Sequence, residues 1–277
     1  MKVSDVMTAN PICAEVPGRR DEVLELMKKH VLAGLPVVKR GTRELVGMIT
    51  RDDLEKDRSE AQVAMLMTRS PITVTPDTEL KEAARILYEN HFGRLPVVKD
   101  DELVGIITVG DIVRRGISKM KIDDPVSKYM LKYIVAVWDE TPTPVVFKIM
   151  RLCWEKALCV INSDLKIVGL VKDADIFKRM SLETEVRTAE LSPSLEGDTW
   201  AWDSKNIIYI GEQRMEIPDI PIKEVMVKNP KMVTTGTTVT DCAKKMAKYK
   251  VGQFPVIDGV GELRGIVRDF DLLKALI

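Results

Sequence analysis

The sequence predicts a mixed α/β (α+β) fold made of four β-α-β-β-α repeats, paired into two modules, with a β-hairpin inserted between repeats three and four. Two observations predict it. Four anchor residues recur in the same order along the chain. Between the anchors, short apolar runs of strand length alternate with a segment whose apolar residues fall three or four positions apart, as in an amphipathic helix. An apolar fraction of 45% in 277 residues is enough for the cores of one large or two ordinary domains.

The anchors of a repeat are a Met after a short helical approach, a Pro in one strand, a Gly in the next strand and an Asp in the helix that follows. The four sets are Met7, Met67, Met130 and Met226; Pro36, Pro96, Val160 and Pro255; Gly47, Gly105, Gly169 and Gly265; and Asp53, Asp111, Asp175 and Asp271. Successive Gly anchors are 58, 64 and 96 residues apart, and the Asp anchors repeat these intervals. This agreement predicts repeats at residues 1–58, 59–116, 117–180 and 222–277, with an insert at 181–221.

Repeat two shows the expected elements most clearly. A short strand at residues 72–74 precedes a helix with one apolar face. That face consists of Leu80, Ala83, Ala84 and Leu87. A strand at 95–98, a polar turn at 99–102 and a second apolar strand at 103–107 then lead to a helix that opens at Thr108. Unpaired N–H groups and the positive end of the helix dipole make such a junction suitable for a phosphate.

Neighbouring repeats are expected to pair, because a unit of about 50 residues buries its own sheet face poorly. The natural pairs are repeat one with repeat two and repeat three with repeat four. Residues 114–125 contain Gly116, Pro125 and several charges, so they are the expected connection between the pairs.

The insert has a pattern of its own. Trp200 and Trp202, a polar turn at 204–206 and an apolar run at 207–210 predict a β-hairpin. Two interpretations stay open. The hairpin is either a packed embellishment of the fold, or a surface whose tryptophans dock a partner or cover the mouth of a ligand site.

Composition excludes several classes of protein. The 42 basic and 42 acidic residues cancel, so the chain lacks the positive charge of a general nucleic-acid binder. The four Cys lack C-x-x-C spacing and only two His are present, so no metal site is expected. No apolar run approaches the roughly 20 residues of a membrane span, and no signal-peptide core is present, so we expect a cytoplasmic protein. Five Asn and three Gln against 30% charged residues favour a thermophilic source.

No pattern indicates catalysis, so the chain is not expected to be an enzyme. His91 has no accompanying Ser or Cys nucleophile pattern, and a His at a helix end is more often a partner of the helix dipole. Neither a Walker A nor a G-x-G-x-x-G sequence occurs. Each junction carries one Asp, without the second carboxylate that general acid–base catalysis needs.

Three segments of repeat two carry a family resemblance. M-T-x-x-P-h-x-V at residues 67–74, L-P-V-V at 95–98 and G-I-I-T-x-x-D at 105–111 closely resemble the cystathionine-β-synthase (CBS) domain. The resemblance covers nearly the whole chain outside the insert. Four copies in one chain are similar to the γ subunit of AMP-activated protein kinase and to stand-alone archaeal and bacterial CBS proteins. This resemblance implies paired modules, often stacked into a flat disc, that bind adenosine-containing ligands between the repeats of a pair.

The Thr and Asp at the end of a repeat allow two interpretations. Thr-x-x-Asp is a capping pattern in which both side chains only satisfy backbone N–H groups. The CBS resemblance implies instead that the carboxylate, at an exposed helix mouth, accepts the ribose hydroxyls while the Thr hydroxyl and nearby N–H groups hold phosphate. With the family in view, the ligand interpretation leads at Thr50/Asp53 and at Thr108/Asp111. Arg94 matches a phosphate-contacting Arg of many nucleotide-binding members, and the alternative is a solvated surface Arg.

The second pair departs from this pattern. Asp175 and Asp271 are kept, but Lys172 and Arg268 replace the Thr, and each cation either faces a phosphate or points to solvent. Asp173 and Asp269 offer an alternative cap, which favours a purely structural helix start. We align Gly34, Leu158 and Gln253 with Arg94, so the second pair lacks this Arg. The complete set of candidate ligand-binding residues is Thr50, Asp53, Arg94, Thr108, Asp111, Ile12, Ile72, Pro36, Pro96, Lys172, Asp175, Arg268 and Asp271.

The sequence therefore predicts a regulatory, energy-sensing protein that binds AMP, ADP or ATP, with S-adenosylmethionine as a further possibility and no catalytic cofactor. Residues 1–116 should be the tighter-binding half. The alternative is a structural subunit with vestigial ligand sites, and an undetected enzyme is a distant third. Expected partners are the nucleotide and either a regulated protein or further copies of the chain, with neither nucleic acid nor a membrane span.

Overall fold

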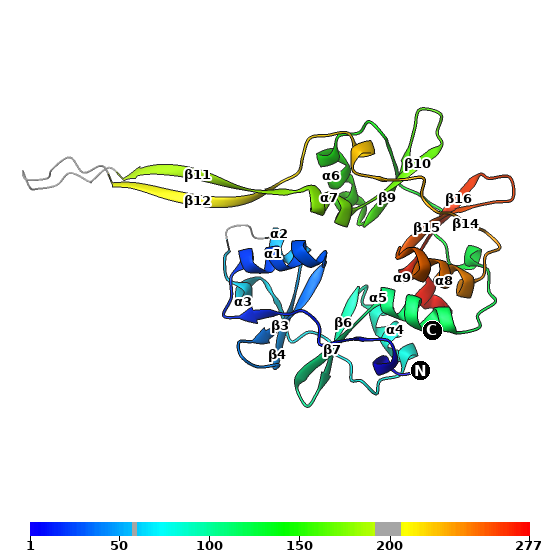
Figure 1. The fold of residues 1–277 in the computed structure, drawn as a ribbon, viewed down its shortest axis with the longest axis horizontal. Coiled ribbons are helices and arrows are strands. Elements are labelled where there is room, and N and C mark those ends of the chain that lie inside the picture. The colour runs from blue at the N-terminus through cyan, green and yellow to red at the C-terminus, as the bar shows by residue number, and fades with distance from the viewer. Residues whose placement is uncertain (57–59, 192–205) are drawn as a thin grey trace, which may run out of the picture.

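The computed structural model describes residues 1–56, 60–191 and 206–277. Four repeats are arranged around a common centre, and a long hairpin extends away from them (Figure 1). Repeat one consists of β2 (Ala14–Val16), α1 (Arg20–His30), β3 (Gly34–Lys39), β4 (Leu45–Thr50) and α2 (Arg51–Lys56). Repeat two consists of α4 (Leu80–Glu89), β6 (Arg94–Lys99), β7 (Glu102–Thr108) and α5 (Val109–Asp111), preceded by the short helix α3 (Val63–Leu66).

The second pair has the same order of elements. Repeat three consists of β8 (Ala136–Trp138), α6 (Thr143–Cys153), β9 (Ala157–Ile161), β10 (Ile167–Lys172) and α7 (Asp173–Arg179). Repeat four consists of β14 (Val233–Thr234), α8 (Val239–Tyr249), β15 (Gln253–Ile257), β16 (Leu263–Arg268) and α9 (Asp269–Leu272). The mixed α/β fold of four repeats is thus confirmed.

Short strands exchanged between repeats hold each pair together. Strand β1 (Thr8–Ala9) of repeat one pairs with β7, and β5 (Thr68–Arg69) of repeat two pairs with β4. Strand β13 (Val227–Lys228) of repeat four pairs with β10 in the same way, and Leu131 of repeat three bridges to Ile266 of repeat four. These exchanges confirm the pairing of one with two and of three with four.

The Met and Gly anchors mark this exchange. A Cβ at Gly47 would lie 2.7 Å from Sδ of Met67, and a Cβ at Gly105 would lie 2.6 Å from Sδ of Met7. The Met of each repeat therefore packs on the Gly of its partner, where a larger side chain has no room. Close packing explains why these two residue types recur together in the sequence.

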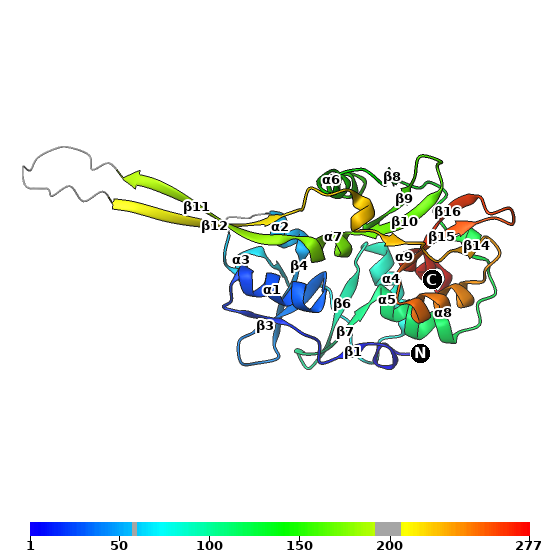
Figure 2. The same cartoon turned by 45° about the horizontal axis from the view of Figure 1, so that its top comes forward.

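Helices join the two pairs through two separate cores. One core combines repeats one and three, and the other combines repeats two and four. Large side chains of the first are Leu24, Met27, Ile49, Val146 and Phe177, and of the second Leu87, Ile112, Met246, Phe254 and Leu272. The turned view shows the two pairs stacked on each other (Figure 2). The chain between the pairs also contributes, because Ile112–Gly116 and Ile117–Lys119 continue α5 as helical turns and Ile117 is fully buried.

The predicted elements of repeat two hold with one exception. Its helix buries the expected face, and Asp100 and Asp101 turn the β6–β7 hairpin with φ of 52° and 63°. The predicted strand at 72–74 is wrong, since only Val74 pairs, in a single bridge to Val97. Proline at positions 71 and 76 brackets this segment and supplies no N–H donor.

Hairpin register corrects one alignment made from the sequence. Gly105 pairs with Val97, whereas Gly169 pairs with Val160. Cys159 rather than Val160 is therefore equivalent to Pro96, and Ala157 rather than Leu158 is equivalent to Arg94. A constant offset fails here because the β9–β10 loop is longer than the β6–β7 turn.

The insert forms the predicted β-hairpin, but its first strand lies at Ser181–Leu191, earlier in the chain than the strand predicted around Trp200 and Trp202. Strands β11 (Ser181–Leu191) and β12 (Asn206–Glu216) pair antiparallel over their whole length. Asn206, which was assigned to the turn, begins β12. Trp200 and Trp202 lie outside the described residues, so the two interpretations of the tryptophans stay predictions. Within the described ranges, no helix has the length and apolar character to cross a membrane.

Candidate ligand site

A cavity of about 360 Å³ lies between repeats one and two; we call it the pair-one cavity. It brings together four of the predicted site residues, Thr50, Ile72, Arg94 and Pro96. Its other lining residues are Ala33, Met48, Arg51, Asp52, Thr68, Ser70, Pro71, His91, Phe92, Gly93, Lys156 and Asp173. Lys156 and Asp173 belong to repeat three, so the second pair of repeats contributes to a site of the first.

Thr50 and Asp53 form a reciprocal cap at the start of α2. Thr50 donates to Asp53 Oδ2 from its hydroxyl at 2.7 Å and from its amide at 3.0 Å, and the Asp53 amide donates to Thr50 Oγ1 at 3.3 Å. Lys56 Nζ lies 3.1 Å from the other carboxylate oxygen, Oδ1. Asp53 is only 8% exposed, so the expected exposed helix mouth is wrong at this position. The capping interpretation thus describes the observed geometry.

Thr108 and Asp111 repeat this arrangement in repeat two. The Thr108 hydroxyl donates to Asp111 Oδ2 at 2.6 Å, and the Asp111 amide donates back to Thr108 Oγ1 at 3.1 Å. Asp111 is 7% exposed, and Arg115 Nη1 lies 3.6 Å from its Oδ1. Here too the carboxylate is buried rather than at an open mouth.

Arg94 reaches from repeat two across to repeat one. Its Nη1 donates to the Gly34 carbonyl oxygen at 2.7 Å, and its side chain lines the pair-one cavity. Burial, followed by the nearby charge of Arg51, lowers the pKa of Arg94 to about 10, which leaves it protonated at neutral pH. Arg94 is therefore not the solvated surface arginine of the alternative interpretation.

Arg51 is a site residue that the sequence analysis missed. Arg51 directly follows Thr50 in the chain, and it is only 7% exposed. Its Nε donates to the Leu32 carbonyl oxygen at 3.0 Å, and its guanidinium lies 4.2 Å from the ring centre of Phe177 in repeat three. Nη1 lies 3.6 Å from Asp173 Oδ2. The signal available in the sequence was the position next to Thr50.

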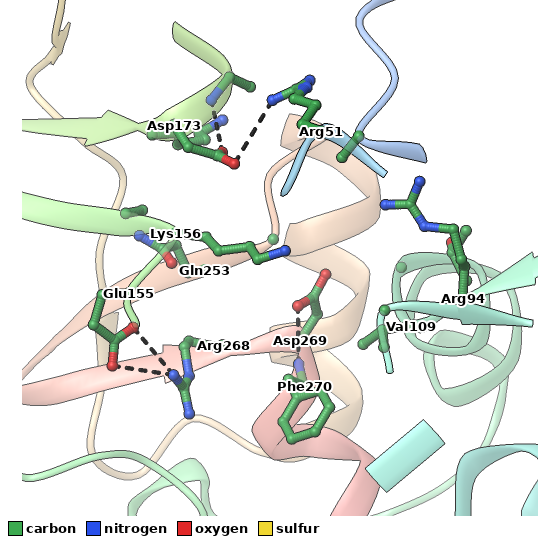
Figure 3. A pocket seen from close by; sticks show the side chains of 18 of the residues that line it. Arg51, Arg94, Val109, Glu155, Lys156, Asp173, Gln253, Arg268, Asp269 and Phe270 are labelled. Carbon is green, nitrogen blue, oxygen red and sulfur yellow. Dashed lines mark hydrogen bonds and ion pairs between the residues drawn. The ribbon is translucent and has the colours of Figure 1, made fainter. Parts of the chain in front are cut away.

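The residue two positions before the Asp anchor lines the same cavity in every repeat. Arg51, Val109, Asp173 and Asp269 all line a central cavity of about 540 Å³ to which all four repeats contribute (Figure 3). Its charged lining residues are Arg51, Arg94, Arg114, Lys156, Lys172 and Arg268, with Glu155, Asp173 and Asp269. The cations outnumber the carboxylates, so this centre favours anions.

Repeat four covers its own anchor carboxylate. Arg268 donates to Asp271 from Nε at 3.0 Å and from Nη2 at 2.9 Å, while its Nη1 donates to Glu155 at 3.1 Å. Asp271 is 2% exposed. Arg268 thus neither points to solvent nor leaves this carboxylate open to a ribose.

Asp173 and Asp269 are not caps in the expected sense. Each is the first residue of its helix, while Lys172 and Arg268 occupy the N-cap positions. Their Oδ1 atoms accept from the next amide, of Ala174 at 2.6 Å and of Phe270 at 2.8 Å. Burial raises the pKa of Asp269 to about 6.

The remaining predicted residues are spread over the fold. Thr108, Lys172 and Arg268 line the central cavity. Among the residues that the structure describes, six of the predicted set line neither cavity. They are Ile12, Pro36, Asp53, Asp111, Asp175 and Asp271.

The family follows from a match along most of the chain. A model of the CBS domain matches residues 3–59, 63–118, 126–182 and 222–277. The chain belongs to the CBS domain family. An uncharacterized protein of Methanocaldococcus jannaschii, MJ1225, is 24% identical to this CBS protein in an alignment of 275 positions that covers 91% of this chain and 90% of that protein.

Two solved structures that match the whole chain agree with the fold. The MJ1225 structure, described as a proposed archaeal homologue of γ-AMPK, covers 100% of both chains with a TM-score of 0.73 at 19% identity, which shows the fold alone. An uncharacterized conserved protein from Pyrococcus horikoshii covers 100% of both chains with a TM-score of 0.68 at 29% identity. The complex of CBSX2 with AMP matches 41% of this chain and 93% of that chain, with 36% identity and a TM-score of 0.39.

Proposed function

We propose that this CBS protein is a non-catalytic sensor that binds an adenine nucleotide in the pair-one cavity. The observation that carries the proposal is the position of the Arg94 side chain. It extends from repeat two to the Gly34 carbonyl oxygen of repeat one, and it lines the same cavity as Thr50. A guanidinium fork at this place suits the oxygens of a phosphate.

The cavity has an apolar end and a cationic end. Met48, Ile72, Phe92 and Pro96 supply apolar surface suited to a base, and Ile72 is 46% exposed. Arg51, Arg94 and Lys156 line the side that is shared with the central cavity. A ligand with a flat apolar group at one end and a phosphate at the other matches this arrangement.

We assign the ribose to the start of α2, where Thr50 lines the pair-one cavity. Asp53 is hydrogen-bonded to Thr50 and lies outside the lining, so a ribose hydroxyl would reach its carboxylate only when Lys56 moves away. Asp53 Oδ1 lies outside the reciprocal cap and pairs only with the exposed side chain of Lys56 among the contacts of the described residues. Accepting a ribose hydroxyl there would displace Lys56 and leave the cap in place. The Thr50 hydroxyl already donates to Asp53, so it can accept from a ligand or orient the carboxylate.

Titration with AMP, ADP, ATP, adenosine and S-adenosylmethionine tests the proposal. A saturable rise in melting temperature, with a matching calorimetric isotherm, is expected for at least one nucleotide. The absence of saturable binding for all five would reject the sensor and favour a scaffold. The cover that Arg268 places over Asp271 favours a structural role for the second pair.

A further inference from the structure

Two carboxylates line the pair-one cavity and have a charge that opposes the proposed ligand, Asp52 and Asp173. Asp52 pairs with Arg151 of α6, whereas Asp173 pairs with Arg51, a cation of the cavity lining. Asp173 comes from the first turn of α7 in repeat three, and it lines both the pair-one and the central cavity. Its amide donates to the Lys156 carbonyl oxygen at 2.9 Å, so the β9–β10 hairpin sets the positions of Asp173 and Lys156 together. Its carboxylate oxygen Oδ2 lies 3.6 Å from Arg51 Nη1 (Figure 3). Both side chains line the pair-one cavity.

A carboxylate and a phosphate offer the same kind of oxygen acceptor to a guanidinium. Asp173 therefore stands where an anionic group is favoured, in reach of Arg51 and on the lining that Arg94 and Lys156 share. Its side chain is 32% exposed, so Asp173 can exchange its contact with Arg51 for water.

We propose that Asp173 is a specificity-determining residue that competes with the ligand phosphate for Arg51. Nucleotide binding then replaces the ion pair between Arg51 and Asp173, which joins repeats one and three, with an ion pair between Arg51 and the phosphate. This inference rests on the proposed function. It makes Asp173 a built-in competitor that weakens binding of every phosphate-bearing ligand and leaves an uncharged nucleoside unaffected.

The exchange also links ligand binding to the contact between repeats one and three. Arg51 packs over Phe177 of α7, and the next residue, Asp52, accepts from Arg151 of α6 at 2.9 Å. A phosphate that draws Arg51 away from Asp173 removes one of the polar contacts through which α2 meets repeat three. The sensor thereby has a route from the pair-one cavity to the second pair of repeats.

The test compares Asp173→Asn with wild type by calorimetric titration of AMP and adenosine. The amide keeps an oxygen to accept from Ala174 and removes only the charge. We expect AMP affinity to rise by about fivefold, since removal of a partly exposed ion pair has effects of this size, and adenosine affinity to stay constant. Asp269→Asn is the matched control: it is the equivalent residue of repeat four, lines the central cavity and is absent from the pair-one lining. It should leave AMP affinity unchanged.

A double-mutant cycle identifies Arg51 as the group in competition. In an Arg51→Gln background, the gain from Asp173→Asn should largely disappear. An equal gain in both backgrounds, or no gain for AMP in wild type, would overturn the inference while nucleotide binding itself stands. If the wild-type protein binds no nucleotide, the inference and the proposed function fall together.

Discussion

Arg94 Nη1 donates a hydrogen bond of 2.7 Å to the carbonyl oxygen of Gly34, the residue at the equivalent position of repeat one. The approach depends on the missing side chain, because a Cβ at Gly34 would lie 2.5 Å from that nitrogen. One repeat of the pair thus supplies the guanidinium and the other supplies the space for it. The two repeats are related in sequence, and their difference at this position makes the pair-one cavity asymmetric.

Replacing Arg94 should separate recognition of phosphate from recognition of the nucleoside. Arg94→Gln is expected to lower the affinity for AMP by about tenfold to a hundredfold, which corresponds to the loss of one charged hydrogen bond, with little effect on the affinity for adenosine. Arg94→Lys should rescue only part of the loss, because it restores charge without the planar fork. Isothermal titration with both ligands measures this. Equal losses for AMP and adenosine would exclude a phosphate role for Arg94.

A methyl group at Gly34 should disrupt the contact between Arg94 and the Gly34 carbonyl oxygen without changing Arg94 itself. Gly34→Ala forces Arg94 out of position and also brings the new Cβ to 3.0 Å from the Ile49 carbonyl oxygen. We expect AMP affinity to fall about tenfold, as for a lost charged hydrogen bond. Gly236→Ala is the control, because its Cβ would meet nothing within 4 Å. Unchanged AMP affinity in Gly34→Ala would show that Arg94 does not need its observed place to bind the ligand.

Asp53→Ala should cost stability as well as affinity. A carboxylate at an exposed helix mouth would contribute little to folding, but the cap that Asp53 forms with Thr50 is buried, and loss of such a cap costs about 0.5–2 kcal/mol. Urea denaturation measures this term, and AMP titration measures the ribose contact. Asp111→Ala removes the equivalent cap in repeat two, whose Thr108 is absent from the pair-one lining. It should lose similar stability with AMP affinity intact, and equal affinity losses would contradict the ribose assignment.

These cases show which features the sequence can predict. The repeats and their pairing were predictable because Met7 packs on Gly105 and Met67 on Gly47, so each contact fixes two residue types at constant spacing. The Thr–Asp cap was predictable because its two residues are only three positions apart in the chain. Burial of Asp53 was missed because packing over α2 comes from elsewhere in the chain.

Contacts between the two pairs of repeats could not be predicted from the sequence. Asp173 is 122 positions from Arg51 in the chain, and no periodicity links them. Lys156 lies in a repeat whose hairpin loop differs in length, which also misplaced the equivalents of Arg94 and Pro96 by one residue. Such contacts depend on how α2, α6 and α7 stack, and only the assembled fold determines that.

The carboxylate of Asp269 should make stability depend on pH. Burial raises its pKa from 3.8 to about 6, while Arg114 and Arg268 partly oppose the rise. The folded state therefore binds this proton more tightly than the unfolded chain, so this residue's contribution to stability is complete below about pH 4 and declines as pH rises to about 6. A shift of this size corresponds to roughly 1–3 kcal/mol, given that the side chain is only partly buried.

Asp269→Asn isolates that contribution from the other carboxylates. The amide keeps an acceptor for the Phe270 N–H and has no charge to bury. Chemical denaturation at pH 4 should give nearly equal free energies of unfolding for the variant and wild type, because both side chains are then neutral. At pH 7 the variant should be the more stable of the two by about 1–3 kcal/mol. A difference between the two proteins that does not change from pH 4 to pH 7 would show that Asp269 titrates normally and that Arg114, Lys156 and Arg268 compensate its charge in the central cavity.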